Sequence, residues 1–157
     1  MGGRVTAVCT APESGAPMER RESVEAVAGK GLRGDRYFDD EGTWSDDDRF
    51  PDVARDVTLF AAETLDAVRR DYDIEIAATD HRRNVTVEGV AVNHLVGERF
   101  AVGDAVFEGV QLCEPCGYLE RLTDIEGVRE SLVHRGGLNA AVVESGVVTV
   151  DDTVERL

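Results

Sequence analysis

Two cysteines, Cys113 and Cys116, lie close together in the run Leu112-Cys113-Glu114-Pro115-Cys116-Gly117-Tyr118. Apolar residues before this run recur with the period of a strand, and those after it recur with the period of a helix. Pro115 suits the first turn of a helix, where its missing N–H costs nothing, so we expect Cys116 among the unpaired amides of that turn. A thiol there has a lowered pKa and is more often thiolate, the form that attacks electrophiles, carries sulfur or binds metal.

The alternative for each cysteine is burial as a small apolar side chain, a common fate of an unmodified thiol. This alternative is favoured for Cys113, which ends an apolar strand, and for Cys9, which ends another. It is disfavoured for Cys116, which follows the turn. We therefore predict that Cys116 is the catalytic residue.

Arginines are concentrated in a few predicted loops. One loop carries Arg33, Asp35 and Arg36 among glycines, and pairs of arginines stand at Arg20-Arg21 and Arg82-Arg83. Guanidinium groups bind phosphate bidentately, so these side chains either face a small anion or pair with internal carboxylates such as Asp35. The sequence leaves both interpretations open.

The composition is strongly acidic, with 32 Asp and Glu against 17 Lys and Arg, a formal net charge of −15 and Lys30 as the only lysine. Such a surface repels nucleic acids and anionic membranes, so neither is an expected partner. It is typical of proteins adapted to high salt, which suggests a halophilic source. Residues 39–52 form an acidic insertion that lacks the alternating oxygen ligands of a calcium loop.

No apolar run approaches the length of a membrane span and no signal-peptide core is present, so we expect a cytoplasmic protein. The odd number of cysteines, 3, argues against a disulfide framework. At 157 residues we expect a single domain, residues 1–157, without internal repeats.

Periodicity predicts about eight short strands and two or three short helices. The class is therefore mainly β, and we expect a closed or nearly closed barrel with helices at one end. Predicted strands lie at 4–9, 24–27, 56–60, 84–88, 99–112 with a break at 103–104, 138–143 and 147–150, and predicted helices at 61–72 and 125–132. Asp151-Asp152 is expected to end the last strand.

Several stretches, in this order, resemble the MOSC domain family, named for the C-terminal domain of molybdenum cofactor sulfurase. They are Gly31-Leu32-Arg33-Gly34-Asp35-Arg36, Arg82-Arg83-Asn84-Val85-Thr86-Val87-Glu88-Gly89, Val102-Gly103-Asp104-Ala105-Val106, Cys113-Glu114-Pro115-Cys116, and Arg135-Gly136-Gly137-Leu138 with Gly146-Val147-Val148. The resemblance implies a β-barrel-like fold that binds molybdenum cofactor (molybdopterin) or a related ligand.

The resemblance also implies that the family cysteine, which aligns with Cys116, accepts sulfur as a persulfide and passes it to a metal centre. The sulfur donor would be a cysteine desulfurase, which carries its own pyridoxal phosphate, and the acceptor would be a molybdoenzyme or its cofactor. The predicted cofactor-binding residues are Arg20, Arg21, Arg33, Asp35, Arg36, Arg83 and Asn84.

Other functions remain open at this point. Some family members reduce N-hydroxylated compounds with molybdenum ligated by the family cysteine, so Cys116 is also the candidate metal ligand. A third possibility is a non-catalytic module that binds the cofactor. A dithiol redox pair is less favoured because the βαβ context is missing. A structural zinc site is less favoured because Cys9, His81, His94 and His134 are scattered.

Overall fold

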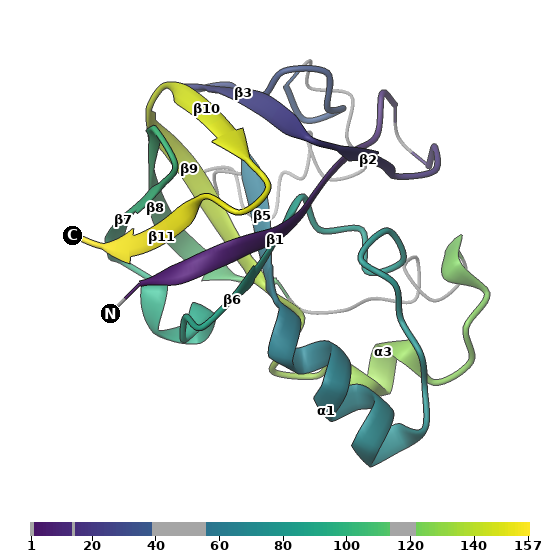
Figure 1. The fold of residues 1–157 in the computed structure, drawn as a ribbon. Coiled ribbons are helices and arrows are strands. Elements are labelled where there is room, and N and C mark those ends of the chain that lie inside the picture. Colours follow the sequence, from purple (N-terminus) through teal and green to yellow (C-terminus); the bar gives the residue numbers. More distant parts are fainter. Residues whose placement is uncertain (1, 14, 39–55, 114–121) are drawn as a thin grey trace.

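The computed structural model describes residues 2–13, 15–38, 56–113 and 122–157. Strands dominate them (Figure 1). The strands are β1 (Gly3–Thr10), β2 (Glu19–Arg21), β3 (Ser23–Val27), β4 (Gly31–Leu32), β5 (Val57–Ala61), β6 (Val85–Glu88), β7 (Arg99–Val102), β8 (Ala105–Leu112), β9 (Leu138–Glu144), β10 (Gly146–Thr149) and β11 (Thr153–Arg156). The helical segments are α1 (Ala62–Tyr72), the short 3-10 helix η1 (Val92–Leu95) and α3 (Val128–Ser131).

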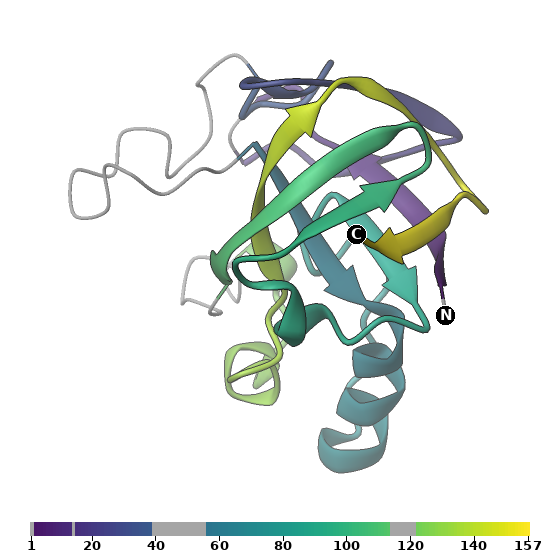
Figure 2. The same cartoon turned by 90° about the vertical axis from the view of Figure 1, so that its left-hand side faces the viewer.

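The main sheet closes on itself as a barrel. Its strands follow the order β11-β7-β8-β9-β5-β6-β1, and β1 pairs back to β11 through Gly3 opposite Val154. Figure 2 shows these strands around a common interior. β2 adds to the outer edge of β1, while β10, β3 and β4 form a smaller sheet. The predicted class, mainly β and barrel-like with few helices, is confirmed.

The strand β11 is a correction to the sequence-based assignment. The acidic pair Asp151-Asp152 lies in the turn that ends the predicted strand at 147–150, as expected. The strand that follows it, Thr153–Arg156, was not predicted, and it pairs with both β7 and β1. The predicted count of about eight strands is too low, because short strands with few buried residues show little periodicity in the sequence.

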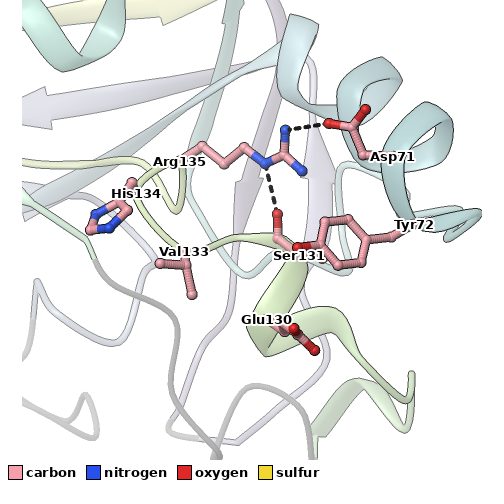
Figure 3. A pocket seen from close by; sticks show the side chains of 7 residues that line it. All are labelled: Asp71, Tyr72, Glu130, Ser131, Val133, His134 and Arg135. Atoms are coloured by element: carbon pink, nitrogen blue, oxygen red, sulfur yellow. Dashed lines mark hydrogen bonds and ion pairs between the residues drawn. The ribbon is translucent and has the colours of Figure 1, made fainter.

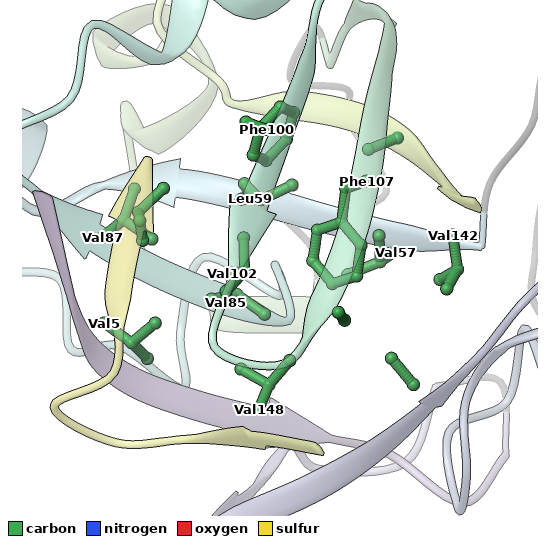
Figure 4. Close-up of a cluster of buried hydrophobic side chains, with 14 of the residues drawn as sticks. Val5, Val57, Leu59, Val85, Val87, Phe100, Val102, Phe107, Val142 and Val148 are labelled. Atoms are coloured by element: carbon green, nitrogen blue, oxygen red, sulfur yellow. The ribbon is translucent and has the colours of Figure 1, made fainter. Parts of the chain in front are cut away.

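Side chains fill the interior of the barrel (Figure 4). Alternate residues of β8 and β9 are buried, as expected for strands with one face on the core. Phe100 and Phe107 meet edge to face, with ring centroids 5.9 Å apart. The interior of the barrel is therefore a packed core of side chains. The labelled core residues in Figure 4 are Val5, Val57, Leu59, Val85, Val87, Phe100, Val102, Phe107, Val142 and Val148.

Helices α1 and α3 lie together beyond one end of the barrel in both ribbon views. α1 belongs to the crossover that joins the parallel strands β5 and β6, a connection that requires a long segment. Phe60, on the outer face of β5, packs into a second apolar cluster with Val68 of α1 and Val128 of α3. No helix among the described residues is long and apolar enough to cross a membrane.

Candidate functional site

One group of connected residues on the barrel, called the rim, includes Cys113, the described residue that precedes Cys116 most closely in the sequence. We define this rim as Arg83, which precedes β6, Gly136 and Gly137, which precede β9, and Cys113, which follows β8. The amide of Cys113 donates to the Gly137 carbonyl at 2.8 Å. The Arg83 Nε donates to the Gly136 carbonyl at 2.7 Å. Two consecutive glycine carbonyls thus tie the cysteine segment to an arginine.

Gly137 makes this arrangement possible because no other residue fits its backbone. Its φ of +111° lies in the region that disfavours side chains, and an added Cβ would stand 2.3 Å from the Leu59 carbonyl oxygen. Glycine here lets the chain pass against β5 while its carbonyl turns toward Cys113.

The two described cysteines are buried. Cys113 is 8% exposed and Cys9 is 1% exposed, as expected for packing residues. Burial raises the pKa of the Cys9 thiol, and the nearby Arg20 partly opposes that rise. Cys116, predicted as catalytic residue and metal ligand, and the helix predicted from Pro115 lie outside the described residues. They remain predictions.

Asp35 and Arg36 form an ion pair inside the protein. Arg36 Nη1 lies 2.9 Å from Asp35 Oδ1, and the same oxygen accepts the Ala11 amide at 3.1 Å. The Arg36 amide donates to the Ala11 carbonyl at 2.7 Å. These contacts fasten the glycine-rich loop to the end of β1. The structure thus gives Arg36 an internal carboxylate partner, the second of the two interpretations that the sequence left open.

Arg33 and Arg21 pair with carboxylates on the surface. Arg33 Nε lies 3.0 Å from Glu25, and Arg21 Nη2 lies 3.2 Å from Glu19. All four side chains are about half exposed, so each pair contributes little to stability and leaves its arginine accessible. Their contacts with a ligand stay predictions.

Asn84 is a structural cross-link, 2% exposed. Its Oδ1 accepts the Thr58 amide at 3.0 Å, and its Nδ2 donates to the Cys9 carbonyl at 3.1 Å. The side chain therefore joins β1 to β5 just before β6 begins. From this position it holds the neighbouring Arg83 at the rim.

Arg20 and Arg83 are the predicted arginines whose side chains have no carboxylate partner among the described residues. Arg20 lies on β2 opposite Cys9, and its side chain makes no hydrogen bond or ion pair with the described residues. Arg83 uses its Nε for Gly136, while its terminal nitrogens make no bond to described residues. Both guanidinium groups lower the pKa of the buried His81, so their charges act on the same region.

Sequence reasoning gave His81 no role beyond that of a scattered histidine. It is fully buried, its Nε2 lies 2.9 Å from Thr86 Oγ1, and its Nδ1 accepts the Arg83 amide at 2.9 Å. Burial is the main cause that lowers its pKa to about 3, followed by the charges of Arg83 and Arg20. The run His81-Arg82-Arg83-Asn84 was the only available signal.

A surface pocket of about 540 Å³ is lined by residues that include Arg135, the residue just before Gly136 of the rim in the sequence (Figure 3). Arg135 Nε donates to the Ser131 carbonyl at 2.7 Å, and its Nη1 donates to Asp71 at 3.2 Å. Hydrogen bonds from Arg70 and Arg135 hold the pKa of Asp71 below its usual range. Arg135 thus ties α1 to α3 immediately before Gly136. The lining residues are Asp71, Tyr72, Glu130, Ser131, Val133, His134 and Arg135.

Within residues 2–13, 15–38, 56–113 and 122–157, no group of three or more His, Cys, Asp and Glu side chains is arranged to hold a metal ion. The donors that these residues offer to a ligand at the rim are cationic nitrogen groups. Such donors suit an anion.

Solved structures of low sequence identity share this fold. YuaD from Bacillus subtilis aligns with a TM-score of 0.80 at 16% identity, over 99% of this chain and 96% of that chain. YiiM from Escherichia coli aligns with a TM-score of 0.68 at 17% identity, over 98% and 69%. YiiM from Geobacillus stearothermophilus aligns with a TM-score of 0.70 at 13% identity, over 99% and 75%.

No curated protein matches the chain in sequence. The sequence profile of the MOSC domain matches residues 25–155, which run from within β3 to within β11. This match includes both the rim and the buried Asp35–Arg36 pair. The chain therefore belongs to the MOSC domain family.

Proposed function

We propose that this MOSC domain protein binds molybdenum cofactor, or a closely related anionic ligand, at the rim and carries sulfur on Cys116. The observation that supports the proposal most is the pair Arg20 and Arg83. In a protein with a net charge of −15, two guanidinium groups act on one region without a carboxylate partner among the described residues. Such a pair favours a small anion.

The donor set fits the phosphate and the anionic sulfurs of molybdopterin. Arg83 is oriented by its Nε bond to Gly136, so its terminal nitrogens form the fork that phosphate accepts. Arg20 adds a second charge from β2. Arg36 and Asp35 support the loop beside them. The bound cofactor would supply a metal centre able to accept sulfur.

Cys116 would act as the sulfur carrier. Its thiolate attacks the outer sulfur of a persulfide on a cysteine desulfurase, a new S–S bond forms as the donor S–S bond breaks, and the donor cysteine leaves as a thiolate. The pyridoxal phosphate belongs to that desulfurase. The acceptor would be a molybdoenzyme or its cofactor. Cys113 is buried, which leaves the attack to Cys116.

The test compares wild type, Cys116→Ser and Cys113→Ser after incubation with a cysteine desulfurase, pyridoxal phosphate and cysteine. Intact mass should show one added sulfur atom on wild type and on Cys113→Ser, and none on Cys116→Ser, because a hydroxyl forms no persulfide. Sulfur on Cys116→Ser would reject the carrier role. Metal analysis of the natively purified protein, with a hydroxylamine turnover assay, separates the carrier from a reductase. Cofactor binding that survives the loss of Cys116 would indicate a binding module.

A further inference from the structure

His81 lies under the rim in an environment that fixes both the position and the proton of its ring. The imidazole stacks on Phe60 with ring centroids 4.1 Å apart and planes 20° from parallel. Nδ1 accepts the Arg83 amide, so Nδ1 carries no proton. The ring is neutral, and its proton therefore sits on Nε2 and is donated to Thr86 Oγ1.

The bond from the Arg83 amide to Nδ1 closes a tight turn. A side chain that accepts the amide two residues later is the geometry of an Asx turn, here made by a histidine. Within the turn Arg82 has a φ of +65°, a backbone conformation that a non-glycine residue adopts only when its surroundings hold it.

The turn sends two consecutive arginines to different partners. Arg82 Nη1 donates to the Ala16 carbonyl at 2.6 Å, whereas Arg83 Nε donates to the Gly136 carbonyl at 2.7 Å. An imidazolium would have a proton on Nδ1, where the Arg83 amide already donates, and would repel both Arg83 and Arg20. The turn therefore requires a neutral ring.

We infer that His81 is a positioning residue of the anion site, because its neutral Nδ1 holds the turn that places the Arg83 guanidinium at the rim. The inference rests on the proposed function, since it concerns the same anion site. His81 does not touch the ligand. It acts through Arg83, and its ring is replaceable by any side chain that presents an acceptor to the Arg83 amide.

The experiment measures the affinity of inorganic phosphate at constant ionic strength for wild type, His81→Asn, His81→Leu and Thr86→Val. Asparagine can form the Asx turn and leucine cannot. Thr86→Val removes the partner of Nε2 but keeps the turn. His94→Leu, at an exposed histidine on η1, is the control for loss of an imidazole. Each variant is first shown to be folded by its amide NMR spectrum.

We expect His81→Leu to bind phosphate at least about tenfold more weakly, the equivalent of one weakened charge-assisted hydrogen bond. His81→Asn and Thr86→Val should bind phosphate within a factor of about two of wild type, even though each variant loses a buried contact and has a lower melting temperature. Equal affinities for His81→Leu and wild type would overturn the inference, as would an Asn variant no better than the Leu variant.

Hydrogen exchange at the Arg83 amide provides a readout that needs no ligand. The amide should be protected in wild type and His81→Asn and exposed to exchange in His81→Leu. If wild type binds no phosphate, the proposed anion site fails, and this exchange pattern alone decides the inference. If the Arg83 amide is as protected in His81→Leu as in wild type, the inference is rejected, even if that variant binds phosphate poorly.

Discussion

At the scale of single residues, the arginines of this protein divide by partner. Arg36 is buried and paired with Asp35. Arg83 donates its Nε to the Gly136 carbonyl, and its terminal nitrogens bind no carboxylate of the described residues. This division separates a role in stability from a role in binding. The same substitution at the two positions should therefore have different consequences.

Arg83→Ala should weaken phosphate binding by about 1.5–3 kcal/mol, the usual worth of a charge-assisted hydrogen bond. Arg36→Ala leaves Asp35 buried without its cation and should lower the free energy of unfolding by about 3–5 kcal/mol. Calorimetric binding and urea unfolding measure both quantities for each variant, with the exposed Arg33→Ala as a control for stability. An Arg83→Ala protein that binds phosphate as tightly as wild type would remove Arg83 from the site.

His81 should make stability depend on pH. Its folded pKa of about 3 is below the ordinary value of 6.5, so between these values the unfolded chain binds the proton and the folded protein does not. Stability therefore rises with pH across this window, by at most about 1.4 kcal/mol per pH unit, and levels off above it. Carboxyl groups of an unfolded chain also titrate at the lower end of this window, with ordinary pKa values of about 4.

The His81→Asn variant isolates the histidine contribution. Urea unfolding of both proteins from pH 4 to 7 should give a difference in unfolding free energy that shrinks as the pH falls, because only wild type must keep a neutral histidine. A difference that stays constant across this range would mean that His81 titrates normally in the folded protein.

At the scale of elements, the rim depends on close contact between β9 and β5 at Gly137. Gly137→Ala should lower the free energy of unfolding by more than about 3 kcal/mol, since it combines a strained φ with a Cβ placed against the Leu59 carbonyl. Gly97→Ala is the matched control, because Gly97 also has a positive φ but nothing lies within 4 Å of an added Cβ. Chemical denaturation of the two variants gives the comparison, and equal losses would show that the contact relaxes freely.

The elements that the sequence predicted well are those with a repeated apolar pattern. β8 and β9 alternate buried residues along their lengths, and α1 follows β5 as expected. β2 could not be found this way because all of its residues are exposed. β11 buries only Val154, so its position depends on pairing with distant strands.

The candidate site was predictable in its residue types but not in its pairings. The sequence showed that Arg36 neighbours Asp35. It did not show that Ala11, directly after β1, would donate its amide to Asp35 and help to bury the pair. The role of His81 depends on a hydrogen bond from the Arg83 amide and on stacking against Phe60 of β5, and the run His81-Arg82-Arg83-Asn84 by itself reveals neither contact. Contacts between segments far apart in sequence decide such roles.

At the scale of the whole molecule, charge should dominate the response to salt. The chain carries 32 acidic residues and 17 basic ones, so the exposed ion pairs, such as Arg4 with Glu88, leave many carboxylates to repel one another. Repulsion between surface carboxylates extends over about 30 Å at 0.01 M salt but only over about 3 Å at 1 M salt, because dissolved ions screen it beyond those distances. The melting temperature should therefore rise markedly between 0.01 M and 1 M NaCl. A melting temperature that is flat over this range would contradict the hypothesis that the acidic surface suits high salt.

The pairing of β1 with β11 has a consequence for how the chain folds. The contact between Gly3 and Val154 joins nearly the two most distant points of the described chain, so the ring of strands closes through its least local contact. Non-local pairing of this kind is slow, with folding times of about milliseconds to seconds in all-β domains, because the entropy of a long loop is lost before the contact forms. During synthesis, the part of β1 at Gly3 and Arg4 that pairs with β11 therefore lacks this partner until β11 has been made, whereas Val8–Thr10 can pair with β2 early.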